Sequence, residues 1–176
     1  SCGSGQAGGA GTRNAYIVFV VSQSATLCVS VLEFGAVIIY NGAIMVITFY
    51  GLEFFKIQFG DTTVAFNPFS KESRHKNVRF GADIVLESLR HPDFNGDENM
   101  SHGGKEPFVV TGPGEYEVKG VIMRGFPATS HYDGVSWHST VYSITLENMN
   151  LCFFGPLDEK ELSQSTNETL EEIDVL

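Results

Sequence analysis

Alternating apolar and polar residues in the middle of the chain predict β-structure. Every second residue from Phe55 to Phe59 is apolar, which is the period of a half-buried strand. Gly60-Asp61 gives a two-residue hairpin signal, and residues 62–66 are expected to return as the partner strand. A shorter and more continuously apolar strand is expected at residues 83–87. The pattern therefore favours a domain built mainly from sheets.

The second half of the chain continues this pattern and adds one helix. Further strands are expected at residues 108–110, 115–118, 121–126, 142–146 and 151–154. The first clear helix comes late, where Ser165 and Glu168 form a capping box ahead of Leu170 and Ile173. Residues 173–176 then resemble the opening of another buried strand.

The first 44 residues differ from the rest of the chain. Residues 1–12 are rich in Gly, Ser and Ala, a composition typical of a flexible tail. Ala15–Leu32 contains no charge and has the length of a weak membrane span, but serines interrupt it. We favour a native start at Met45, with the upstream part an artefact; a membrane anchor and an additional strand pair are the alternatives. The expected domains are a non-domain extension, residues 1–44, and a folded unit, residues 45–176.

Composition limits the function classes. A chain of 176 residues with 43% hydrophobic and 12% aromatic residues is expected to fold as one domain with a sizeable core. The formal charge of −10 argues against nucleic acid as a partner, because that binding depends on Lys and Arg. The three cysteines, Cys2, Cys28 and Cys152, are too few for a disulfide framework and form no Cys-x-x-Cys pair. A reducing cytoplasm is the expected compartment.

Candidate chemistry lies where an apolar run, residues 84–86, leads into a polar turn carrying His91 and Asp93. This stretch resembles the strand and loop that carry the His-x-His-x-Asp-His metal motif of the metallo-β-lactamase superfamily. Laid over that motif, His91 and Asp93 match, whereas Leu89 and Phe94 stand where histidines belong. The stretch resembles a metal-binding loop from which about half the ligands have been lost.

Other segments resemble the small lactamase-like, Zn-dependent hydrolases of that superfamily. Gly51-Leu52 and Asn67-Pro68 stand where that subgroup has Gly-His and Asp-Pro pairs. His131 matches a zinc-ligating histidine that follows a strand, and Pro156 stands in place of an aspartate that bridges two metals. The resemblance implies an α/β (α+β) chain with the four-layer αββα metallo-β-lactamase fold, here truncated at the C-terminus.

The resemblance also implies a degenerate metal site. A catalytic zinc site needs about three protein ligands and an open position for water, whose pKa the metal lowers. By this resemblance the first metal retains His91 and His131, and the second retains only Asp93. Zinc is therefore expected to bind weakly or not at all. His102 and His138, in neighbouring polar loops, are the residues that could complete an atypical site.

Three functional hypotheses follow. The leading one is a hydrolase-like protein with a degenerate zinc site, catalytically impaired, that binds a small molecule or a protein in the vestigial cleft. The alternative is a metal-dependent hydrolase in which His91, Asp93 and His131 recruit one atypical ligand to form a single-metal site that activates water. The third is a membrane-tethered accessory protein, which requires residues 15–44 to be native. The sequence specifies neither the ligand nor the oligomeric state.

Overall fold

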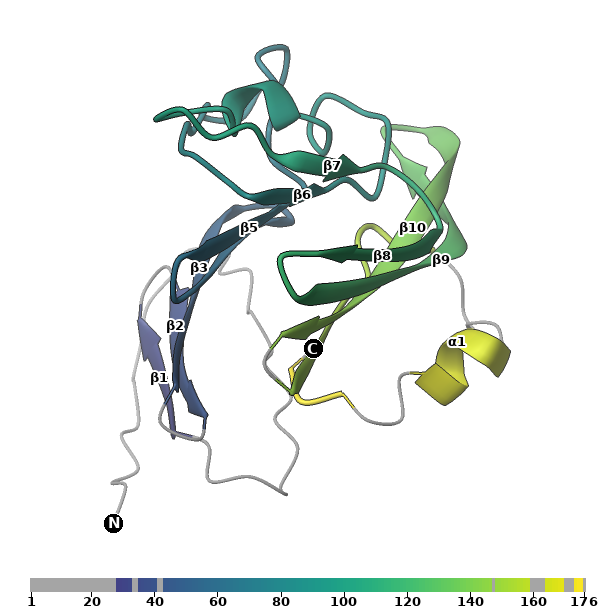
Figure 1. Ribbon diagram of the computed structural model, residues 1–176. Helices are drawn as coiled ribbons and strands as arrows, with labels where there is room; N and C mark the ends of the chain where they lie inside the picture. Colours follow the sequence, from purple (N-terminus) through teal and green to yellow (C-terminus); the bar gives the residue numbers. More distant parts are fainter. Residues whose placement is uncertain are drawn as a thin grey trace, which may run out of the picture.

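The computed structural model describes residues 28–32, 35–40, 43–146, 148–158, 164–169 and 173–175. Within these ranges the chain forms two packed β-sheets, a short helix and a 3₁₀ turn, η1 (Asp97–Asn99) (Figure 1). The fold predicted by resemblance is therefore confirmed in its two β layers. The flanking helical layers of the αββα arrangement are represented, in this described part, only by α1 (Gln164–Thr169) and η1.

The first sheet contains seven strands in chain order. They are β1 (Cys28–Leu32), β2 (Gly35–Tyr40), β3 (Ala43–Gly51), β4 (Phe54–Phe59), β5 (Thr62–Phe66), β6 (Ile84–Leu86) and β7 (Phe108–Val110). Neighbours from β1 to β5 pair antiparallel, whereas β5, β6 and β7 pair parallel. Parallel neighbours need crossover connections, and here the crossovers are long loops.

The second sheet contains four antiparallel strands in the order β11-β10-β9-β8. They are β8 (Gly114–Val118), β9 (Val121–Tyr132), β10 (Val135–Leu146) and β11 (Met149–Phe153). β9 and β10 form one long hairpin, drawn in green, that rises beside the loops above the first sheet (Figure 1). This hairpin carries several of the residues considered below.

The main core lies between the two sheets. The inward residues of β5 and β6, such as Phe66 and Leu86, pack against those of β9 and β10, such as Met123 and Tyr142. Val85 points the other way, into a second apolar cluster beneath the crossover loops. β6 is therefore buried on both faces, which explains why its sequence is continuously apolar rather than alternating.

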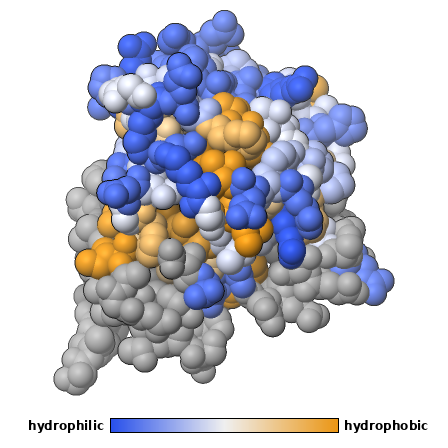
Figure 2. Space-filling view, in the orientation of Figure 1, coloured by the Kyte–Doolittle hydropathy of each residue, from blue (hydrophilic) through white to orange (hydrophobic). Residues whose placement is uncertain are grey.

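Apolar residues also reach the surface. Figure 2 shows apolar side chains in the middle of the visible face, between polar margins. Among the residues whose exposure is described, the exposed large hydrophobics are Ile44, Leu52, Phe108, Ile122 and Val135.

The strand predictions are confirmed for the first sheet, but the predicted end of β9 is wrong. β9 continues past residue 126 to Tyr132, and β10 begins at Val135, so His138 lies in a strand rather than in a polar loop. The connection is the two-residue turn Asp133-Gly134, in which both residues have positive φ angles of 51° and 75°. An Asp-Gly pair is a strong hairpin signal of this type.

The predicted capping box is also wrong. α1 begins at Gln164, one residue before Ser165, and ends at Thr169. Near the end of the chain, Val175 forms a single parallel bridge with Leu151, where the sequence predicts a strand opening.

The segment before Met45 is partly described. β1 and β2 pair with each other, and β2 pairs with β3, so residues 28–32 and 35–40 extend the first sheet. The Gly-rich tail and residues 15–27 of the apolar run lie outside the described residues. No helix in the described ranges is long and apolar enough to cross a membrane. The domain boundary at residue 45 stays a prediction.

Candidate functional site

The candidate site lies at the edge of the first sheet where three strands end. β5, β6 and β7 run in the same direction, so the residues that follow them meet at one edge. These residues are Asn67, Glu87 and Thr111. The Asn67 N–H donates to the Leu86 carbonyl and the Glu87 N–H to the Val110 carbonyl, each at 2.9 Å. Such strand ends are where open α/β sheets commonly bind ligands.

Asn67 serves this edge as a structural hydrogen-bond acceptor. Its Oδ1 accepts from the backbone N–H of Ser88 at 2.8 Å and from the Ser88 hydroxyl at 3.0 Å. The buried Nδ2 of Asn67 has no hydrogen-bond partner. Gly155 packs against the same serine, since a Cβ at residue 155 would lie 2.8 Å from Ser88 Oγ. A glycine is therefore required there, and its φ of 65° adds to the requirement.

His91 and Asp93 lie side by side in the loop after β6. His91 Nδ1 accepts a hydrogen bond from the Asp93 backbone N–H at 3.2 Å and lies 3.7 Å from Asp93 Oδ2. Asp93 Oδ1 accepts from the Ser73 hydroxyl at 2.5 Å, and Oδ2 accepts from the Tyr132 hydroxyl at 2.9 Å. Both oxygens of this carboxylate therefore already accept hydrogen bonds from protein hydroxyls.

These hydroxyls keep Asp93 ionised. Burial alone would raise the pKa of Asp93, but the hydrogen bonds from Ser73 and Tyr132 lower it below its ordinary value. Burial and the hydrogen bond to Asp93 raise the pKa of Tyr132 to about 12. The phenol of Tyr132 consequently stays protonated at neutral pH and remains a donor.

Aromatic and apolar side chains occupy the space around His91. Its ring lies edge-on to Tyr132 and Trp137, with centroid distances of 4.9 and 5.7 Å. Phe94 is fully buried and packs edge-on against Tyr132 at 4.8 Å. Leu89 is only 2% exposed. The two positions that carry histidines in the family motif thus hold close-packed side chains without a metal-binding atom.

His131 projects away from this pair. Neighbouring strand residues point to opposite faces, and Tyr132 uses its own face to reach Asp93. His131 is 61% exposed, and its Nδ1 lies 2.6 Å from Asp158 Oδ2. The structure therefore brings His91 and Asp93 together but does not bring His131 to them.

The two replacement ligands suggested by the sequence lie on different parts of the fold. The His102 carbonyl lies beside Gly81, ahead of β6, whereas His91 follows the end of that strand. His138 belongs to β10, and Pro156 is half-buried after β11. Among the residues with described placement, no three His, Cys, Asp or Glu side chains are grouped to hold a metal ion.

The residues present do not fit the metal centre that the family implies. Both Asp93 oxygens accept hydrogen bonds from hydroxyl donors. Leu89 and Phe94 offer no lone pairs, and both side chains are buried. A zinc site needs deprotonated ligands with free lone pairs directed at one point. That arrangement is missing from the described loop.

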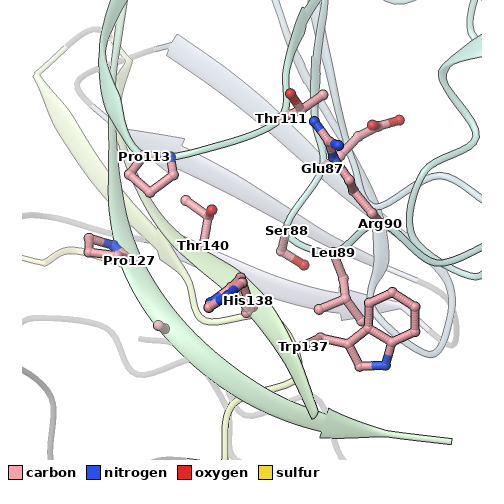
Figure 3. A pocket seen from close by; sticks show the side chains of 12 residues that line it. Glu87, Ser88, Leu89, Arg90, Thr111, Pro113, Pro127, Trp137, His138 and Thr140 are labelled. Carbon is pink, nitrogen blue, oxygen red and sulfur yellow. The ribbon is translucent and has the colours of Figure 1, made fainter. Parts of the chain in front are cut away.

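A cavity of about 530 Å³ adjoins this loop. Glu87, Ser88, Leu89 and Arg90 line it from the strand end, and His138 lines it from β10 (Figure 3). Because Leu89 is both a cavity wall and a replaced ligand position, the cavity borders the vestigial metal loop directly.

Two carboxyl groups with raised pKa values lie in this region, Glu87 buried and Glu53 half-buried. Burial, with the negative charge of Asp97 next in importance, raises the pKa of Glu87 to about 8. Burial raises the pKa of Glu53 to about 7. Glu53 lies near Gly155, since a Cβ at residue 155 would be 3.7 Å from Glu53 Oε2. Near neutral pH, both groups are largely protonated or close to their midpoint.

Sequence reasoning missed Glu87, Arg90, Tyr132 and Trp137 as site residues. The signal that could have found the two aromatic residues was Asp133-Gly134, because a hairpin through that turn places Tyr132 and Trp137 at its tip. The burial of Glu87 has no comparable signal in the sequence.

Comparison with known proteins agrees with this fold. The family profile described as "Beta-lactamase superfamily domain" matches residues 46–176. The chain therefore belongs to the family of β-lactamase superfamily domains. No curated protein sequence gives a significant match.

Solved structures similar to the chain include two that are described as hydrolases. One, from Thermotoga maritima, is described as a candidate Zn-dependent hydrolase of the metallo-β-lactamase superfamily. It is 26% identical to this chain, and the match has a TM-score of 0.52 and covers 72% of this chain and 57% of the Thermotoga chain. The other, described as a candidate metal-dependent hydrolase from Parabacteroides distasonis, is 12% identical, with a TM-score of 0.50 over 74% and 66%. The second likeness concerns the fold alone. The chain spans a little over half the length of the Thermotoga protein.

Proposed function

We propose that this protein is a metal-independent binding module of the β-lactamase superfamily, impaired in metal-dependent hydrolysis. The observation that carries the proposal is the state of Asp93, the one residue retained from the second metal position. Both of its carboxylate oxygens accept hydrogen bonds from Ser73 and Tyr132. Each oxygen has a second lone pair, but within the described ranges no group of three His, Cys, Asp or Glu side chains surrounds it to complete a metal site.

Packing around the same loop supports the proposal. Phe94 and Leu89 are both buried, and removing a large buried side chain costs about 2–5 kcal/mol. The adjoining cavity offers a binding space that requires no such opening. We therefore place the ligand, a small molecule, in this cavity beside the vestigial loop.

The compartment belongs to the same proposal. Cys152 is a buried free thiol, and burial raises its pKa to about 12, so it is an unreactive core residue. A cytoplasmic location, with a small molecule rather than nucleic acid as partner, fits a chain with a formal charge of −10.

Metal content per chain tests the proposal. The whole chain is dialysed after exposure to zinc and to manganese, and bound metal is measured by elemental analysis. We expect no stoichiometric retention. The double variant Leu89→His, Phe94→His restores the motif pattern and serves as the positive comparison, while Asp158→Asn changes only the partner of His131. One metal retained per wild-type chain and lost in Asp93→Ala would overturn the proposal and favour the atypical hydrolase.

A further inference from the structure

We infer that the cavity beside the vestigial loop binds a small carboxylate-bearing compound with a flat or cyclic body, and that Arg90 holds the carboxylate. This inference rests on the proposed function and names the ligand class for the same cavity. A cavity of about 530 Å³ lies within the usual range of about 300–1,000 Å³ for small-molecule sites.

The walls of the cavity favour a ring. Leu89, Pro113, Pro127 and Trp137 line it, and the rings of prolines and tryptophan present flat apolar surfaces. Figure 3 shows the two prolines on one side of the space and Arg90, Glu87 and Thr111 across from them. A ligand that spans the cavity would therefore meet the two proline rings on one side and Arg90, Glu87 and Thr111 on the other.

The polar end carries an unpaired cation. Arg90 is exposed and forms no ion pair with any residue in the described ranges, although the chain has a formal charge of −10. Glu87, which shares this end, does not neutralise it, because burial and Asp97 raise the pKa of Glu87 to about 8. A guanidinium matches a carboxylate with two parallel hydrogen bonds, which gives both affinity and orientation.

Other ligand classes fit these walls less well. A cationic ligand is disfavoured by Arg90, and a purely apolar one would leave Arg90 without a partner. Ser139 also lines the cavity, but its Oγ is closed off from solvent and does not contribute to ligand recognition.

The single tryptophan makes the test direct, since Trp137 lines the cavity and is the only tryptophan of the chain. Fluorescence titrations with benzoate, benzamide and benzylamine compare the same ring with negative, neutral and positive substituents. Ligand-observed NMR on the same solutions checks binding independently of Trp137. We expect saturable binding of benzoate, weaker binding of benzamide and none of benzylamine.

Two variants connect the preference to Arg90. Arg90→Gln should weaken benzoate binding by about tenfold or more and leave benzamide binding unchanged. The matched control is Arg124→Gln, because Arg124 lies on β9 paired with Glu115 at 3.3 Å and does not line the cavity. Thermal melting of both variants establishes that they are folded before binding is compared.

The outcomes separate this inference from the proposed function. Equal binding of benzoate and benzamide, preference for benzylamine, or an Arg90→Gln variant with unchanged benzoate affinity would each overturn the ligand class while the cavity remains a binding site. Absence of binding by all three probes would overturn the ligand class as well. Stoichiometric metal held by the wild-type chain through Asp93 would overturn the metal-independent part of the proposed function, whatever these three probes show.

Discussion

Two aspartates flank β6 and are held by different means: Asp83, directly before the strand, is buried, and Asp93, in the loop after it, is partly buried. At the beginning of the strand, Asp83 accepts hydrogen bonds from Lys105 Nζ and Lys119 Nζ, each at 2.6 Å, and from the Thr63 N–H at 2.9 Å. At the other end, Asp93 is held by two hydroxyls and by no lysine or arginine among the described residues.

The difference shows how a former ligand position can be kept without its metal. Asp83 is neutralised by two ammonium groups, which lower its pKa to about 2 against the effect of burial. Asp93 keeps its charge through neutral donors supplied by Ser73 and by the hairpin tip at Tyr132. Hydroxyl groups and the nearby His91 therefore surround Asp93, whereas two ammonium groups surround Asp83.

The largest expected effect on stability comes from removing the buried aromatic side chain of Phe94, next to Asp93. Phe94→Ala should reduce the free energy of unfolding by about 3–5 kcal/mol, because a fully buried aromatic side chain leaves a cavity. Urea denaturation followed by circular dichroism measures the change. The control is Phe108→Ala, which removes a side chain that is 47% exposed. Similar losses in the two variants would show that the loop is not tightly packed.

The next largest effect on stability is expected for Asp83, which is paired with two lysines. Asp83→Asn should cost about 2–3 kcal/mol, because two charge-assisted hydrogen bonds are lost and two ammonium groups are left facing each other. The same denaturation experiment measures it. Glu115→Gln, which breaks the exposed pair with Arg124, should change stability by less than about 1 kcal/mol. An Asp83→Asn variant as stable as wild type would remove the proposed distinction between the two ends.

The dependence of the free energy of unfolding on pH, at acidic pH, should differ between variants of the two aspartates. The folded pKa of Asp83, about 2, lies below its ordinary value of 3.8, so its contribution is present above pH 4 and is lost as pH falls toward 2. Each such proton contributes a slope of at most about 1.4 kcal/mol per pH unit. Asp83→Asn should flatten this dependence more than Asp93→Asn, because two cations hold Asp83. Denaturation at a series of acidic pH values measures both slopes, and a reversed order would contradict the comparison.

The smallest expected effect comes from one hydroxyl at the hairpin tip. Tyr132→Phe removes the donor to Asp93 Oδ2 but keeps the ring contacts with His91 and Phe94. We expect a loss of about 1 kcal/mol in stability, typical of one hydrogen bond to a charged group that stays partly solvated. The pKa of Asp93, measured by carboxyl-carbon NMR, should rise in this variant. An unchanged pKa would mean that Tyr132 does not hold the carboxylate in solution.

Part of the site could be predicted from the chain and part could not. His91 and Asp93 stand in a motif, so their closeness after a buried strand follows from their spacing of two residues. His131 matches the motif equally well, yet the strand that carries it turns it outward to Asp158. Its predicted ligand role is untested, and the orientation depends on which face of β9 meets the loop. A one-residue difference in strand position selects that face.

The sequence by itself determined a β-rich domain, the hairpin at Gly60-Asp61 and the family. It also determined that Leu89 and Phe94 stand at two positions where the family motif has histidines. Those features depend on local patterns of apolar, turn and ligand residues. Only the tertiary structure decided that Tyr132 and Trp137 would close over His91 and that a cavity with Arg90 at its polar end would form beside them. These contacts join residues about 40 positions apart, and their geometry depends on how two sheets pack rather than on any local spacing.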